Sequence, residues 1–526
     1  MQKVNGFLSQ TLEWLAAAYE QRKGVLLVVT MAAFTLTGIA LFLWGTARYG
    51  IGIRTDSVDY LWSAKDLAHG IGLGTLDAFG KLKAMNHYPP LYPILLSPFE
   101  AVGIPGMVGA RWVGAVLFGL LIILFGLILY RLCAPSFWFP AIGVLVLFFT
   151  PDLWSTTLYA MTEPLYLVCS LAGFLCLDNY DLRRKRRWMV LASLLFGMAF
   201  LTRYIGISVV AVGLLYLLLK KGRNVKSKMT DMLLMGAIAI LPLGAWLIRN
   251  SILTGSATNR GLTFVPIAAE EWRSALGLMA AWINPIPGWT RLNLFGLALF
   301  ALAALCAALI LPKTGADRPG PTGLPLLLGL YACLYAVFVI IAKLLGDPTI
   351  PLNEARILFP LLSCLFFLLL YGFYLLQRMA RRYSILGQAL LAGLLIVLAG
   401  GSLVGRLATI RPYIQPLLVS RYNGLGLQNT SSVSAEFNQK IDGLPADTIY
   451  LTDDIQRLYF YEEKSCSYVG EVTPTDPEMI RAQSLSRDVA VVYFHASQKT
   501  STTLQQLLPQ LALIYQDSTG REIYFK

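Results

Sequence analysis

Long apolar runs constrain this chain more than any other feature of its sequence. A helix needs about 20 apolar residues to cross the hydrocarbon core of a bilayer, and runs of about that length recur along most of the chain. Hydrophobic residues make up 56% of the 526 residues and charged residues 14%, which excludes a soluble globular protein or a disordered chain. The sequence therefore predicts an α-helical polytopic membrane protein. The runs predict eleven transmembrane helices, at residues 25–46, 108–130, 138–153, 157–177, 188–202, 204–219, 231–249, 292–311, 324–345, 357–376 and 384–404.

Clusters of Lys and Arg between the apolar runs indicate the orientation, because positively charged loops stay in the cytoplasm. With eleven spans, all of these clusters fall on the same side as the N-terminus. We therefore expect a multi-pass protein of the plasma or inner membrane, with a cytoplasmic N-terminus and an extracytoplasmic C-terminus. The net charge of +13 is then a signal of topology, and we expect no nucleic-acid partner. The clusters lie at residues 183–187, 220–228, 313–318 and 378–382.

The pattern divides the chain into two domains. We expect residues 1–409 to form the transmembrane domain, including an external loop at 47–107, and residues 410–526 to form a soluble extracytoplasmic domain. Short β-type patterns in the second domain, with a helix-compatible stretch at 500–511, predict a small α/β domain. The external segment at about 250–290 predicts a helix lying at the membrane surface. The predicted strands lie at 448–451, 458–461, 489–494 and 522–525.

Polar residues gather on the side of the membrane opposite to the basic loops. An arginine guanidinium can bind a phosphate through two hydrogen bonds, and a carboxylate can deprotonate a hydroxyl or hold a divalent metal. A phosphate-linked substrate embedded in the membrane needs both kinds of group, so we predict one site at the outer membrane surface. The residues concerned are Asp56, Asp59, Glu163, Arg203, Arg249, Asn250, Glu354 and Arg356.

Each of these residues also has a simpler interpretation. Arg249 and Arg356 can anchor helix ends in the headgroup layer. Glu163 can complement the dipole at a helix N-terminus, and Asp56 can cap the helix that continues from Val58. Their joint position on one side of the membrane favours a shared site over separate structural roles.

Six short motifs carry a resemblance to a known family. The motifs are Asp56-Ser57-Val58-Asp59-Tyr60 with Ala64, Leu67 and Gly70; Tyr88-Pro89-Pro90-Leu91-Tyr92-Pro93; Met161-Thr162-Glu163-Pro164-Leu165; Leu201-Thr202-Arg203-Tyr204; Trp246-Leu247-Ile248-Arg249-Asn250; and Arg356-Ile357-Leu358-Phe359-Pro360. They resemble the motifs of the GT-C glycosyltransferases, which include the protein O-mannosyltransferases and the bacterial lipid A aminoarabinose transferases. The resemblance covers about residues 1–405, and the C-terminal domain is similar to such proteins only in architecture.

The resemblance implies an enzyme that moves a sugar from a polyprenyl-phosphate carrier to an acceptor on the outer face, with inversion at the anomeric carbon. It implies that Asp56 is the base towards an acceptor hydroxyl, and that Glu163 assists it or positions the acceptor. The implied partners are the donor lipid, membrane lipid, and an acceptor glycan, lipid or protein. The implied substrate contacts are Asp59, Tyr60, His87, Tyr88, Arg203, Arg249, Asn250 and Arg356, of which the arginines are candidate phosphate contacts.

The first motif departs from the family pattern. The mannosyltransferases usually have an Asp-Glu pair where this chain has Asp56-Ser57, and Asp59 can replace the second carboxylate only in part. Some GT-C enzymes use a divalent ion and others need none. Metal dependence therefore stays open, and Asp56 and Glu163 are the expected ligands if Mg²⁺ or Mn²⁺ is bound.

Alternative functions stay open at this point. A transporter or flippase of lipid-linked glycans is expected to carry ionisable residues at depth or broken helices at the midplane. This sequence has almost no ionisable residues in the middle of a predicted span, since Lys343 lies near the outer end of the run at 324–345. A scaffold protein whose C-terminal domain binds a partner would leave the external carboxylates unexplained. A polysaccharide ligase or a transferase with a lipid-pyrophosphate donor would be an enzyme of the same broad class.

Overall fold

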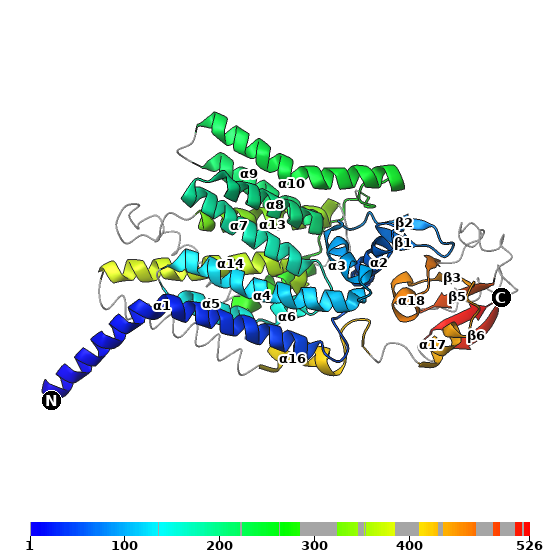
Figure 1. Cartoon of the computed structure of the whole chain (residues 1–526), viewed down its shortest axis with the longest axis horizontal. Coiled ribbons are helices and arrows are strands. Elements are labelled where there is room, and N and C mark those ends of the chain that lie inside the picture. The colour runs from blue at the N-terminus through cyan, green and yellow to red at the C-terminus, as the bar shows by residue number, and fades with distance from the viewer. Residues whose placement is uncertain are drawn as a thin grey trace.

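The computed structural model describes most of the chain (Figure 1). Two predicted spans, 292–311 and 384–404, lie outside the described residues, as does the predicted helix at 500–511. The described residues are 2–134, 136–220, 224–261, 263–283, 323–345, 352, 354–383, 410–429, 435–469, 488–494, 511–517 and 520–525.

Long apolar helices form the body of the molecule and run side by side along its longest axis (Figure 1). Among the described residues, six helices are long and apolar enough to cross a membrane, which makes the chain a polytopic membrane protein. The predicted count of eleven is not confirmed, because α8 (Arg186–Thr202) and α9 (Ile207–Leu219) have only 17 and 13 residues. The six are within α1 (Gln2–Gly45), α4 (Gly106–Cys133), α7 (Glu163–Arg183), α10 (Val225–Thr254), α13 (Leu324–Leu345) and α14 (Ala355–Tyr383).

The predicted span at 138–153 is broken. It consists of α5 (Trp138–Phe148) and α6 (Pro151–Thr157), which meet at an angle of 60° and count as a seventh span only if taken together. Pro151 occupies the first turn of α6, where its missing N–H costs nothing, whereas continuing α5 through a proline would lose a backbone hydrogen bond. The short segment after α6 leads directly into α7, so the break decides where Glu163 is placed.

The external loop after α1 contains regular structure. Residues of the first motif form the surface helix α2 (Thr55–Ala68), as the resemblance implies. A small antiparallel hairpin of β1 (Gly74–Leu76) and β2 (Leu82–Ala84) follows, and α3 (Leu91–Ala101) returns the chain to α4. The predicted surface helix in the second external segment is α11 (Ala269–Ile283).

The C-terminal region contains a mixed five-stranded sheet, which confirms the α/β prediction. The strand order is β4-β3-β5-β7-β6, with β3 parallel to β4 and β5, and β7 antiparallel to β5 and β6. Before the sheet, α16 (Ile410–Tyr422) packs on α1 and α6. The other elements are α17 (Ala435–Asp442), β3 (Ile449–Thr452), α18 (Ile455–Glu462), β4 (Cys466–Tyr468), β5 (Val489–Tyr493), β6 (Ala512–Gln516) and β7 (Glu522–Phe525).

The strand predicted at 458–461 was wrong, because these residues belong to α18. The Asp454 side chain caps this helix by accepting a hydrogen bond of 2.9 Å from the Arg457 backbone N–H. Leu458 is fully buried against the sheet, whereas its neighbours Tyr459 and Tyr461 contact the transmembrane domain and its linker. The aromatic residues of this short segment are typical of a strand, although in the structure they lie on a helix and each contacts a different neighbour.

The C-terminal region docks on the first external loop through α18 and α2. The rings of Trp62 and Tyr459 stack in parallel, with centroids 3.6 Å apart. At the exposed edge of this contact, Lys65 Nζ lies 2.6 Å from Glu463 Oε2. The stacked rings bury a large apolar area, so the ion pair adds little to the docking.

A short backbone ladder ties three distant segments together beneath this junction. The Gly52 N–H donates to the Leu158 carbonyl at 2.8 Å, and the Leu427 N–H donates to the Ile53 carbonyl at 2.8 Å. The ladder therefore joins the segment before α2, the segment before α7 and the linker that leads to the C-terminal sheet. These backbone hydrogen bonds place the first turns of α2 and α7 next to each other.

Gly426 in this ladder is a sensitive position. Its φ is +64°, and an added Cβ would lie 1.9 Å from the Ile53 carbonyl oxygen, so Gly426→Ala combines backbone strain with a collision. We expect this variant to lower the melting temperature of the purified protein by several degrees. Gly70→Ala is the matched control, because Gly70 has a φ of +77° but open space around it. Equal melting temperatures for the two variants would contradict the importance of the ladder.

Candidate active site

A cavity of about 440 Å³ opens where the loop at residues 47–107 meets one end of the helix bundle. Its wall is formed by Asp56 and Tyr60 of α2, by the loop before α3, by the end of α8, and by the ends of α13 and α14. The lining residues are Asp56, Tyr60, His87, Tyr88, Pro89, Thr162, Thr202, Arg203, Tyr204, Ile205, Ile207, Arg260, Tyr335, Phe338, Val339, Ile341, Ala342, Arg356 and Ile357.

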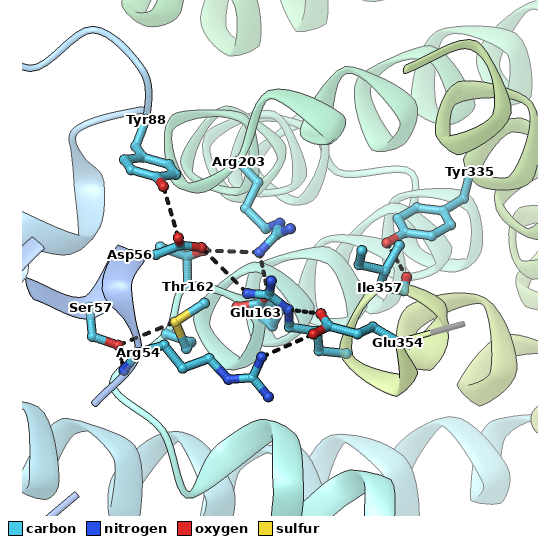
Figure 2. Close-up of polar contacts among 12 residues, drawn as sticks. Arg54, Asp56, Ser57, Tyr88, Thr162, Glu163, Arg203, Tyr335, Glu354 and Ile357 are labelled. Atoms are coloured by element: carbon cyan, nitrogen blue, oxygen red, sulfur yellow. Dashed lines mark hydrogen bonds and ion pairs between the residues drawn. The ribbon is translucent and has the colours of Figure 1, made fainter. Parts of the chain in front are cut away.

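Asp56 lies in the first turn of α2 and presents its carboxylate to this cavity. The Tyr88 hydroxyl donates a hydrogen bond of 2.9 Å to Asp56 Oδ1, and Arg356 Nη1 lies 3.4 Å from Asp56 Oδ2. Figure 2 shows the Tyr88 hydroxyl next to this carboxylate, with the Arg203 side chain pointing towards it. Asp56 is thus oriented from both sides while remaining on the cavity wall.

Glu163 begins α7 and lies behind the cavity wall. Its side chain is 3% exposed, and its Oε1 lies 2.6 Å from Arg203 Nη1 and 3.7 Å from Arg356 Nη1. The Thr162 hydroxyl, which does line the cavity, accepts a further hydrogen bond of 3.2 Å from Arg203. Glu163 is therefore the shared counter-ion of two arginines. Because it lies behind the cavity wall, a bulky acceptor in the cavity cannot reach it.

Arg356 connects this group to a third carboxylate. Its Nε donates to Glu354, whose other oxygen accepts a hydrogen bond of 3.1 Å from Arg54 Nη1. The Arg54 guanidinium also lies 4.6 Å over the ring of Tyr159, a cation–π contact. Burial alone would raise the pKa of Glu354, but the hydrogen bond and charge of Arg356 and the charge of Arg54 outweigh it and lower that pKa. Glu354 is therefore ionised at neutral pH.

Positive and negative charges balance within this network, which we call the charge relay (Arg54, Glu354, Arg356, Asp56, Glu163 and Arg203). Three guanidiniums face three carboxylates. Arg260 brings a further positive charge to the cavity wall, and its guanidinium lies 5.8 Å over the ring of Tyr204. Within the described part of the chain, no carboxylate lies within ion-pair distance of Arg260.

Apolar side chains also line the cavity. They are Phe338, Val339 and Ile341 of α13, Ile205 just before α9, and Ile207 at the first position of α9. Ile341 is also 44% exposed. The apolar part of the wall therefore includes an exposed side chain of a helix that is long and apolar enough to cross a membrane.

Aromatic side chains support the Asp56 side of the cavity. The Tyr60 ring meets those of Tyr88 and Tyr92 edge-on, with centroids 5.0 and 5.6 Å apart. The His87 ring meets Tyr88 edge-on at 4.6 Å. Burial and then the negative charge of Asp56 raise the pKa of Tyr88 far above its usual value, so its hydroxyl stays protonated and donates to Asp56.

Three predicted substrate contacts lie away from the cavity. Arg249 donates hydrogen bonds of 3.1 Å to the backbone carbonyls of Leu73 and Met85 and thereby holds the hairpin against α10. Asn250 donates to the Ala257 carbonyl at 3.0 Å. Asp59 faces the C-terminal region, where Gln456 Nε2 lies 3.4 Å from its Oδ1. The structure brings together Asp56, Tyr60, His87, Tyr88, Arg203 and Arg356, with Glu163 directly behind them.

Sequence analysis missed three residues of this site, namely Arg54, Arg260 and Tyr335. Arg54 is only two residues before Asp56, and this proximity in the sequence could have indicated that it belongs to the site. Arg260 follows α10 in an irregular segment, where no periodicity tells which side chain faces a cavity. The Tyr335 hydroxyl donates to the Ile357 carbonyl at 2.7 Å, a contact that depends on how α13 packs on α14.

The residues present do not fit a divalent metal at the expected ligands. Within the described residues, no three His, Cys, Asp or Glu side chains gather in a way that could hold a metal ion. Asp56 and Glu163 face arginine guanidiniums instead, whose charge would repel a cation.

Comparison with known proteins places the fold. No protein-family model and no curated protein matches the sequence. The solved structures show that the chain has the fold of the GT-C polyprenyl-phosphate glycosyltransferases over most of its length, which confirms the resemblance at the level of architecture.

Two proteins illustrate this similarity. ArnT from Cupriavidus metallidurans in the apo state matches with a TM-score of 0.59 and 15% identity, covering 94% of this chain and 97% of that chain. The same protein bound to undecaprenyl phosphate matches with a TM-score of 0.57 and 17% identity, over 95% and 97% of the two chains. The arabinofuranosyltransferase AftD from Mycobacteria matches with a TM-score of 0.51 and 14% identity, over 94% of this chain and 41% of that chain.

Asp59 gives a prediction for pH dependence. Burial, and then the negative charge of Asp56, raise the pKa of Asp59 from its usual value near 3.8 to about 7, against the smaller opposing effects of Gln456 and Lys83. The folded protein therefore holds this proton more tightly than the unfolded chain, and the contribution of Asp59 to stability is lost as pH rises from about 4 to about 7. We expect Asp59→Asn to flatten the fall in melting temperature between pH 5 and pH 7.5. An unchanged slope would show that Asp59 titrates normally.

Proposed function

We propose that this chain is an integral membrane glycosyltransferase that moves a sugar from a polyprenyl-phosphate carrier to an acceptor hydroxyl on the outer face of the membrane. One observation carries the proposal: a single cavity combines a carboxylate, Asp56, with arginines and with apolar side chains of helices that are long and apolar enough to cross a membrane. Such a cavity suits a substrate with an anionic head and a long hydrocarbon tail. The fold shared with ArnT, which has been solved with undecaprenyl phosphate, supports this class of donor.

The donor phosphate would bind at the arginines of the cavity. Arg203 and Arg356 are held in place by Glu163, and Arg260 adds a positive charge that no described carboxylate neutralises. The prenyl chain would leave the cavity along Ile341 and its apolar neighbours. Oriented positive charges stabilise the negative charge that grows on a departing phosphate, and they need no reorganisation when they do so.

Asp56 would act as the general base. It takes the proton from the acceptor hydroxyl while the acceptor oxygen bonds to the anomeric carbon, and the bond from that carbon to the phosphate oxygen breaks with its electron pair on the phosphate. Attack from the face opposite to the phosphate inverts the anomeric configuration. Tyr88 and Arg356 orient the carboxylate, so the rate gain comes from positioning as well as from proton transfer.

Replacing the base tests the function directly. We expect Asp56→Asn to lower the rate of sugar transfer by about 100- to 10,000-fold while the protein still folds. The assay follows sugar transfer by purified protein from a polyprenyl-phosphate sugar to extracted acceptor lipids and glycans, with mass spectrometry of the products.

Asp77→Asn is the matched control for this experiment. Asp77 lies in the same external loop, where its Oδ1 accepts hydrogen bonds from the backbone of Phe79 and Lys81, and it does not line the cavity. Full activity of Asp56→Asn would remove the proposed role of Asp56. Movement of a lipid-linked glycan without any new glycosidic bond would favour a transporter instead.

The proposal also requires the cavity to face the outside of the cell. Lys81 is exposed at the tip of the hairpin near the cavity, and Lys185 is exposed in the basic loop between α7 and α8. We expect a membrane-impermeant maleimide to label Lys81→Cys in intact cells and to label Lys185→Cys only after permeabilisation. The reverse labelling pattern would place the cavity in the cytoplasm and contradict the proposed orientation.

A further inference from the structure

We propose that Glu354 is a positioning residue that keeps Arg356 from closing onto Asp56, so that Asp56 stays available to the acceptor hydroxyl. This inference rests on the proposed function and adds a role for a residue that neither touches the substrate nor lines the cavity. It follows from how Arg356 divides its guanidinium among three carboxylates.

Glu354 is itself firmly placed. It directly precedes α14, and its backbone carbonyl accepts a hydrogen bond of 3.1 Å from the Ile357 N–H in the first turn of that helix. Its side chain binds Arg356 through Nε on one oxygen and Arg54 through Nη1 on the other. The carboxylate therefore has little freedom to follow Arg356 if that side chain moves.

Arg356 is held close to Glu354 and loosely to the other two carboxylates. Its Nη1 lies 3.4 Å from Asp56 Oδ2 and 3.7 Å from Glu163 Oε1. Charge-assisted hydrogen bonds between a guanidinium and a carboxylate normally measure about 2.7–2.9 Å. A guanidinium is planar and rigid, so a bond at Nε fixes where its Nη atoms lie and holds them short of full contact with Asp56.

Removing the charge of Glu354 would free Arg356 to move. Asp56 and Glu163 both attract it, and a neutral acceptor at position 354 would hold Nε more weakly than a carboxylate does, because the attraction between opposite charges is lost. Arg356 would then form a two-bond pair with Asp56, which occupies the oxygens that must accept the proton. The chemical step would suffer, whereas the positive charge available to a phosphate in the cavity would not decrease.

The test separates the chemical step from donor binding in the purified full-length protein. We expect Glu354→Gln to lower kcat by about 10- to 100-fold, while the Kd for undecaprenyl phosphate stays within about 3-fold of the unchanged protein. Glu354→Asp, which keeps the charge, should recover kcat to within about 3-fold. Glu100→Gln is the matched control, because Glu100 is an external carboxylate that accepts a hydrogen bond from the Gly106 backbone and lies outside the charge relay.

Three results would overturn the inference. One is an unchanged kcat in Glu354→Gln, another is a loss of undecaprenyl phosphate binding that accounts for the whole effect, and the third is a Glu354→Asp variant as impaired as Glu354→Gln. Melting temperatures of all variants exclude a mere loss of folded protein. If the unsubstituted protein neither binds undecaprenyl phosphate nor transfers sugar, the proposed function itself fails, which is a different outcome from any of these three.

Discussion

The pairing of arginines with carboxylates at the cavity end of the helix bundle is the interaction on which the rest of this structure depends. Arg54 directly precedes α2, Asp56 belongs to α2, Glu163 to α7, Arg203 to the end of α8, and Glu354 and Arg356 to the start of α14. A charge left alone at the edge of a membrane is costly, because neither lipid nor the protein interior replaces its hydration. These segments must therefore meet, and the cavity forms where they do.

The backbone around the charge relay is shaped to allow this meeting. Pro151 interrupts the run that follows α4, so α7 starts at the cavity end of the helix bundle with Glu163 in its first turn. The ladder at Gly52 then sets α2 beside α7. The same ladder continues to Gly426 in the linker, and the stack of Trp62 on Tyr459 fixes α18 against α2. The C-terminal region is thus part of the support of Asp56, although it contributes no residue to the cavity wall within the described chain.

The sequence predicted the class of the fold and the chemical centre of the site for physical reasons that are local. Apolar runs mark membrane helices wherever they occur, and the motifs around Asp56, Glu163, Arg203 and Arg356 lie at helix ends, whose side of the membrane follows from the basic loops. The parts it missed depend on contacts between distant segments. The helix at Leu458 was read as a strand, because composition does not show a helix cap. Asp59, Arg249 and Asn250 carry the right chemistry, but their partners, Gln456 and the carbonyls of Leu73, Met85 and Ala257, are set by tertiary packing.

The central claim is that the cavity beside Asp56 holds the phosphate of a polyprenyl-phosphate donor. The most direct measurement is a cryo-EM structure of the full chain with undecaprenyl phosphate. The account predicts phosphate density between Arg203, Arg260 and Arg356, within reach of an acceptor oxygen that contacts Asp56, with the prenyl chain leaving along Ile341 of α13. Phosphate density elsewhere on the protein, with the cavity beside Asp56 empty, would contradict it.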